Sequence, residues 1–106
     1  MFTQLRAVNY FVYMVECADE SFYVGVTNDV ERRIGEHNFG WDPTSYTHER
    51  RPVRLVYCED FQRIEQAIAW EKQLKGWSRG KKIALIQGDW NQIQRLSRDH
   101  PSTSSG

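Results

Sequence analysis

The sequence predicts an α/β (α+β) fold in which a three-stranded antiparallel sheet is flanked by helices. Two runs rich in aromatic and β-branched residues, 11–15 and 22–28, lie on either side of a short polar break, which is typical of a β-hairpin. A third run of this kind covers residues 53–58, and helical spacing follows the second run and the third. We therefore expect the element order β-β-α-β-α-α, with a possible short final helix.

A three-residue loop is expected to join the first two strands. With that loop, Tyr13 stands opposite Gly25 across the hairpin. Tyr23 stands opposite Val15, so the two tyrosines project from one face of the sheet. The last loop position usually needs a left-handed backbone. Glu20 would occupy it at a cost of roughly 1 kcal/mol. Ordinary core packing would also explain two tyrosines on neighbouring strands.

The first helix is predicted from residue 29 onward and carries a charge on its inner face. Val30, Arg33, Ile34 and His37 follow the spacing of the stripe that a surface helix turns toward its core. Arg33 stands where an apolar residue would be expected, whereas Arg32 lies off the stripe. A buried charge is costly unless it is paired. Arg33 is therefore either part of a salt bridge or a residue that faces a functional cleft.

The helix that follows the third strand, over about residues 62–75, shows the same anomaly with the opposite sign. Glu71 continues the inward stripe that begins with Ile64 and Ala67. An ion pair with Lys75, four residues on, is the ordinary explanation and is worth only a few tenths of a kcal/mol. Alternatively, Glu71 and Arg33 meet across a shared cleft.

The C-terminal part is predicted to form two more helices. Ser78 can cap a helix that runs to about residue 87, and Asp89 can cap a short helix over residues 90–96. We expect one domain over residues 1–98, followed by a disordered tail over residues 99–106. The residues expected to face the core here are Ile83, Ile86, Trp90, Ile93 and Leu96.

Composition excludes a membrane protein and does not point to a nucleic-acid binder by itself. The chain has 106 residues, a formal net charge of zero and no apolar run of the roughly 18 residues that a membrane helix needs. The N-terminus lacks a signal-peptide pattern, so a cytoplasmic protein is expected. Cys17 and Cys58 lie in strand-like runs without metal-site spacing, which favours buried reduced thiols.

Basic residues nevertheless gather in two places. Arg50 and Arg51 lie at the exit of a long loop over residues 38–51, and residues 72–82 contain no acid. A local basic surface is what contact with phosphates needs, although a solvated helix face has the same composition. The expected nucleic-acid contacts are Arg50, Arg51, Lys72, Lys75, Arg79, Lys81 and Lys82.

An ordered set of residues resembles the signature of the GIY-YIG nuclease family. The set is residues 11–13 (Phe-Val-Tyr), residues 23–25 (Tyr-Val-Gly), Val30 with Arg33 and His37, and a later helical Glu71. The sequence is similar to the short stand-alone bacterial members, from about residue 10 to residue 86 or 98. The resemblance implies one compact α/β sandwich with the site on its open side.

The resemblance also implies roles for five residues. Glu71 would hold one divalent cation, Mg²⁺ or Mn²⁺, because a carboxylate with waters and phosphate oxygens suits these ions. Arg33 would pair with the phosphate as it gains charge. Tyr13 would act as the general base or relay to it, and Tyr23 would position the water or the phosphate. His37 is an alternative proton acceptor or a phosphate contact.

The expected function is a metal-dependent DNA endonuclease in repair or recombination, with DNA as its partner and a protein partner for targeting left open. One alternative is a nucleic-acid-binding module with little catalysis. The zero net charge favours it, and so does the lack of the asparagine that many members carry after the metal ligand. Another alternative is a partner subunit of a larger repair complex. Which of Tyr13, Tyr23 and His37 takes the proton stays open, as does the choice between DNA and RNA.

Overall fold

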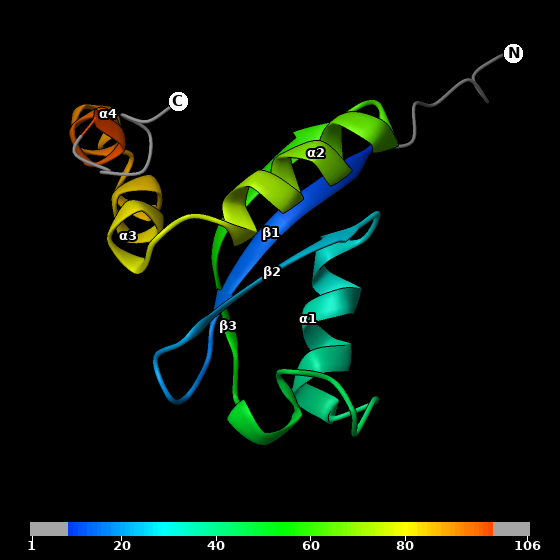
Figure 1. Ribbon diagram of the computed structural model, residues 1–106. Coiled ribbons are helices and arrows are strands. Elements are labelled where there is room, and N and C mark those ends of the chain that lie inside the picture. Colours follow the sequence, from blue (N-terminus) through cyan, green and yellow to red (C-terminus); the bar gives the residue numbers. More distant parts are fainter. Residues whose placement is uncertain (1–8, 99–106) are drawn as a thin grey trace, which may run out of the picture. The chain divides into compact units, whose positions relative to one another are not determined.

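The computed structural model of the protein describes residues 9–98, and these residues form two compact units that divide after Lys75 (Figure 1). The first unit contains the sheet with two helices, and the second contains two more helices. In the described part of the chain, no helix is long and apolar enough to cross a bilayer.

The sheet of the first unit has three antiparallel strands in the order β2-β1-β3, which confirms the predicted fold class. The strands are β1 (Tyr10–Glu16), β2 (Phe22–Thr27) and β3 (Arg54–Phe61). Tyr13 pairs with Gly25, as the three-residue loop required. Glu20 takes the predicted left-handed conformation, with φ 71°, and Asp19 accepts hydrogen bonds from the backbone and side chain of Ser21, which hold the loop.

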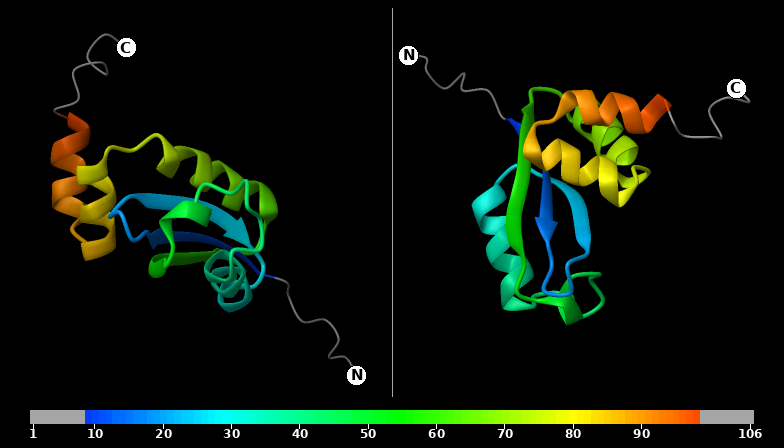
Figure 2. Two further views of the ribbon diagram at one scale, coloured as in Figure 1. Left: turned by 90° about the horizontal axis from the view of Figure 1, so that it is seen from below. Right: turned by 90° about the vertical axis from the view of Figure 1, so that its left-hand side faces the viewer.

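Two α-helices cover this sheet on opposite sides, as the left view of Figure 2 shows. Helix α1 (Val30–Phe39) is capped by Asp29, whose carboxylate accepts a hydrogen bond from the Arg32 backbone N–H. Ile34 of this helix packs on the β1 core. Helix α2 (Ile64–Lys75) packs on β1 and β2. A short 3₁₀ turn, η2 (His48–Arg50), lies in the long loop before β3.

The core lies along the central strand, because β1 is covered on both faces. Val12, Met14 and Val15 are fully buried. Of the two cysteines, Cys17 is buried as predicted, but Cys58 is exposed because it lies on the edge strand β3.

The second unit is a pair of helices, α3 (Arg79–Gln87) and α4 (Trp90–Arg98), which pack on each other. Ser78 caps α3 as predicted, and Gly88, with φ 73°, ends it. Ile93 is buried, but Trp90 is 56% exposed, so its expected core position is wrong: it is the first residue of α4 and lies at the turn. The predicted tail, 99–106, lies outside the described residues, and the extent of one domain over 1–98 stays a prediction.

Candidate active site

The site begins with Tyr13, whose ring lies across Gly25 of the neighbouring strand. Tyr13 is 1% exposed, and a Cβ atom added to Gly25 would lie 2.6 Å from the phenol oxygen. That distance is too short for two heavy atoms that are not bonded, so only glycine at position 25 leaves room for the ring. The Tyr-x-Gly motif contains this glycine, but the need for it comes from the close approach of the ring.

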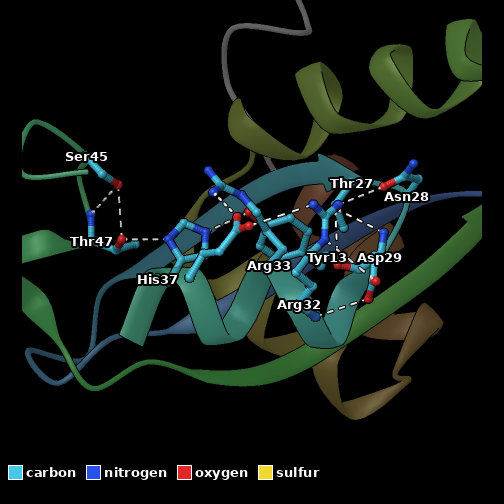
Figure 3. Close-up of polar contacts among 10 residues, drawn as sticks. Tyr13, Thr27, Asn28, Asp29, Arg32, Arg33, His37, Ser45 and Thr47 are labelled. Carbon is cyan, nitrogen blue, oxygen red and sulfur yellow. Dashed lines mark hydrogen bonds and ion pairs between the residues drawn. The ribbon is translucent and has the colours of Figure 1, made fainter. Parts of the chain in front are cut away.

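Tyr13 heads a buried chain of hydrogen bonds that runs through His37 into the loop after α1 (Figure 3). The Tyr13 phenol oxygen lies 2.8 Å from His37 Nε2, and His37 Nδ1 lies 2.7 Å from Thr47 Oγ1. Ser45 Oγ continues the chain at 3.1 Å from Thr47. His37 and Thr47 are 4% and 1% exposed. No pattern in the sequence pointed to Thr47, because it lies in an irregular loop.

Burial sets the protonation state of Tyr13 and His37, the two titratable groups of this hydrogen-bond chain. Desolvation, with a smaller contribution from Tyr23, raises the pKa of Tyr13 to about 12, although the nearby Arg33 charge opposes the rise. Desolvation and the Arg33 charge lower the pKa of His37. At neutral pH the phenol is therefore protonated and the imidazole neutral. A neutral imidazole has one donor and one acceptor nitrogen. The hydrogen bonds from Tyr13 through His37 to Thr47 can therefore pass a proton in one direction at a time.

Arg33 lies beside this chain and is half-buried on the inner face of α1. Its side chain is 36% exposed, and its Nη1 donates to Glu36 Oε1 at 3.1 Å. Arg32 is more exposed, at 56%, in accordance with its place off the stripe. Glu36, which sequence reasoning missed, is the partner of Arg33. The salt-bridge explanation of Arg33 is thus partly correct, but the partner lies on the same helix.

Glu71 lies on the buried side of α2, with its side chain 17% exposed. Its Oε2 is 2.8 Å from Lys75 Nζ, so the ordinary i, i+4 pair is present. The hydrogen bond to Glu71 raises the pKa of Lys75 despite partial burial. Lys75 also lies 5.9 Å above the ring of Tyr23, which connects α2 to the tyrosines. Arg33 and Glu71 each form an ion pair within their own helix.

The residues present fit a single divalent cation only as a site completed by water and substrate. Within residues 9–98 no group of three His, Cys, Asp or Glu side chains converges on one point. Mg²⁺ in phosphoryl-transfer sites is commonly held by one or two carboxylates, several waters and phosphate oxygens. Glu71 offers such a carboxylate, provided that the Lys75 ammonium shares it or moves aside.

Aromatic rings form the wall of the site around Tyr23. Its ring centroid lies 6.3 Å from that of Tyr13, 5.3 Å from His37 and 5.9 Å from Tyr46, on which it stacks. The Arg50 guanidinium lies 3.9 Å over Tyr46 and donates to Asp19 at 3.1 Å. Arg50, predicted to contact nucleic acid, therefore joins the hairpin loop to the loop before β3.

The remaining predicted nucleic-acid contacts are divided between the two units. Arg51 donates to the His48 carbonyl oxygen at 2.7 Å, and Lys72 is exposed on α2. The second unit carries Arg79, Lys81 and Lys82 on α3. Lys81 lies 4.2 Å over the Trp77 ring, and burial lowers the pKa of Lys82.

Comparison with known proteins identifies the family of the chain. Residues 9–84 match the GIY-YIG catalytic domain. A UPF0213 protein of Haloquadratum walsbyi is 46% identical over 78 residues, which cover 74% of this chain and 86% of that protein. A UPF0213 protein of Staphylococcus saprophyticus is 44% identical and covers 73% of this chain and 93% of its own length.

A solved structure supports the same assignment. The solution structure of a UPF0213 protein from Bacillus halodurans is 41% identical and has a TM-score of 0.50, covering 84% of this chain and 97% of that one. The fold and the site thus define a domain of the GIY-YIG nuclease superfamily. The chain belongs to the GIY-YIG family and is similar throughout the matched region to its small UPF0213 members.

Proposed function

We propose that the protein is a metal-dependent endonuclease that hydrolyses phosphodiester bonds in DNA and acts in repair or recombination. The observation that carries this proposal is the buried chain from Tyr13 through His37 to Thr47, with the Arg33 guanidinium beside it. Hydrolysis of a phosphodiester needs a proton acceptor for the attacking water and positive charge near the phosphoryl oxygens. Both needs are supplied by this one cluster.

The proton acceptor acts as a pair. A phenol with a pKa of about 12 is protonated at neutral pH and cannot accept a proton by itself. Tyr13 can accept one from water while it passes its own proton to His37 Nε2, which lies 2.8 Å away. This transfer requires His37 Nδ1 to be protonated and to donate a hydrogen bond to Thr47 Oγ1. The hydroxide so formed attacks phosphorus, and the P–O bond to the departing oxygen breaks. That oxygen takes a proton from solvent, and the imidazolium releases its proton to water through Tyr13, which restores the pair.

Arg33 and Glu71 would stabilise the negative charge that develops on the phosphate during the reaction. The Arg33 guanidinium is half-exposed and suits two oxygens of a phosphate as the transition state gains charge. Glu71 would hold the cation, which when bound supplies further positive charge and assists the departing oxygen. Tyr23, in ring contact with His37 and stacked on Tyr46, would restrict where the phosphate and the water can lie.

A binding module with little catalysis is the second candidate, and one contact favours it. The Lys75 ammonium lies 2.8 Å from the Glu71 carboxylate and takes the place where a cation would bind. In that case Lys75 itself would supply the positive charge near the site, and DNA would bind without being cut.

Plasmid nicking with Mg²⁺ or Mn²⁺ separates the two candidates. An endonuclease should nick supercoiled DNA, lose activity with chelator and lose it again in Glu71→Gln, which keeps the shape of the side chain. Binding without nicking, under every metal condition, would select the module. Arg32→Ala, outside the cluster, is the control that should retain activity.

A further inference from the structure

Two large aromatic side chains at the end of α1 are uncovered. Phe39 is 75% exposed and Trp41 is 69% exposed, and their ring centroids lie 5.7 Å apart at an interplanar angle of 52°. Aromatic rings usually contribute their area to a core. Two exposed rings side by side form an apolar patch, and such patches are typical of interaction sites.

The backbone holds this pair in place. Gly40, with φ 76°, caps α1, and its N–H donates to the His37 carbonyl oxygen at 3.2 Å. The N–H of Trp41 donates to the Glu36 carbonyl oxygen, also at 3.2 Å. These two bonds are the helix-ending motif that satisfies the last carbonyls. Trp41 is therefore anchored to the same helical turn that carries His37, even though its ring is open to solvent.

Trp41 of this pair adjoins the candidate active site, and Phe39 lies beside Trp41. Trp41 lines a small pit together with Arg33, Glu36 and His37. The volume of the pit is about 10 Å³, which suits one water molecule rather than a ring. A base could therefore not enter it, but a base could lie on Trp41 at its rim, and on the adjoining Phe39, while its phosphate reaches Arg33.

We propose that Phe39 and Trp41 form a stacking site for a nucleobase of the bound strand, next to the phosphate that Arg33 receives. The proposal rests on the proposed function, because it assumes a nucleic-acid ligand. Base–aromatic stacking is sequence-tolerant, since every base has a π-face. A protein surface is a poorer occupant, because Trp41 borders a polar pit lined by the Arg33 guanidinium rather than an apolar groove.

Binding, measured without cleavage, tests this site. Fluorescence anisotropy in the presence of chelator compares a labelled oligothymidine with an oligomer of equal length in which most bases are replaced by abasic spacers. Both ligands carry the same phosphates, so only the first can stack. The full-length chain should bind the oligothymidine more tightly, and the double variant Phe39→Ala/Trp41→Ala should lose roughly tenfold to a hundredfold of that affinity. Its affinity for the abasic oligomer should be unchanged.

Trp90→Ala supplies the matched control, because Trp90 is also an exposed tryptophan, 56% exposed, but lies on α4. It should leave the preference for base-bearing DNA unchanged. Equal binding of both oligomers by the parent chain, or equal losses for both in the double variant, would overturn the stacking site while nucleic-acid binding stands. Failure of the parent to bind either oligomer would instead overturn the proposed function. Sedimentation that shows a dimer of the parent but a monomer of the double variant would make the rings a self-interface and overturn the stacking site.

Discussion

The two units of the protein differ in charge and in what their charged groups do. Residues 9–75 carry eight basic and twelve acidic side chains, a net charge of −4, whereas residues 76–98 carry five basic and one acidic, a net charge of +4. The first unit buries titratable groups, as at Tyr13 and His37. The second carries Arg79, Lys81 and Lys82 on one helix of its pair. A zero net charge thus hides an acidic first unit and a basic second unit, and the role that the proposed function gives to each unit can be tested separately.

The largest effect is expected from removing the charged groups of the first unit. Arg33→Ala and Glu71→Ala should each lower single-turnover nicking by about 10²–10³-fold, as loss of a group that stabilises transition-state charge does. Because both side chains are partly solvated and pair within their own helices, melting temperatures should change little. Only Glu71→Ala should abolish Mg²⁺ or Mn²⁺ binding in a titration. Large losses of stability without any metal binding by the parent would make both pairs purely structural.

Gly25→Ala should damage the same unit through packing. The new Cβ would meet the Tyr13 ring at 2.6–2.9 Å, so the ring or the strand must shift at a cost of about 1–3 kcal/mol. Nicking should fall because the phenol leaves His37. Gly35→Ala is the matched control: its Cβ would meet nothing within 4 Å, and the helix should gain roughly 0.5–1 kcal/mol. Denaturant unfolding measures the free energy of unfolding of both variants. Equal changes in the two would contradict the expected clash at position 25.

Thr47→Val tests whether the loop threonine orients His37. The substitution keeps the shape but removes the partner of Nδ1, which should lower nicking by about tenfold and the free energy of unfolding by about 1–3 kcal/mol. Thr47→Ser restores the hydroxyl and should recover most of the activity. A serine variant as impaired as the valine variant would mean that the methyl group, rather than the hydrogen bond, matters.

Neutralising the second unit should change affinity but leave chemistry intact. Replacing Arg79, Lys81 and Lys82 by Gln should flatten the plot of log affinity against log salt by about 0.7–0.9 for each phosphate that the variant no longer neutralises. The single-turnover rate at saturating DNA should stay near that of the parent. An unchanged slope would show that the basic face of α3 is only solvated. A large loss of the single-turnover rate would show that α3 also contributes to catalysis.

The smallest expected effect is a pH dependence of stability that belongs to the first unit. The fold lowers the pKa of His37, so the unfolded chain binds its proton more readily than the native protein does. His37 therefore contributes stability above the unfolded pKa of about 6.5, and that contribution is lost as pH falls below this value. Melting curves from pH 7.5 to 5 should show a steeper decline for the parent than for His37→Gln. Parallel declines would contradict the burial of a neutral imidazole.

The sequence by itself determined the parts of the fold that follow local rules. Strand alternation and loop length set the pairing of Tyr13 with Gly25, and helical spacing placed Arg33 and His37 on one face. Ser78 caps its helix as predicted, because a cap depends only on neighbours along the chain. These regularities have short periods, so a single sequence is enough to read them.

Only the tertiary structure decided which groups meet and in what protonation state. Thr47 reaches His37 from a loop without periodicity, and Arg33 pairs with Glu36. Trp90 is exposed, since apolar character does not say whether a neighbouring element covers a residue. The raised pKa of Tyr13 follows from burial, which depends on the whole packed unit. Burial, and the contact between Thr47 and His37, depend on segments that are distant in sequence. Their relative positions are fixed by tertiary packing and not by any local pattern.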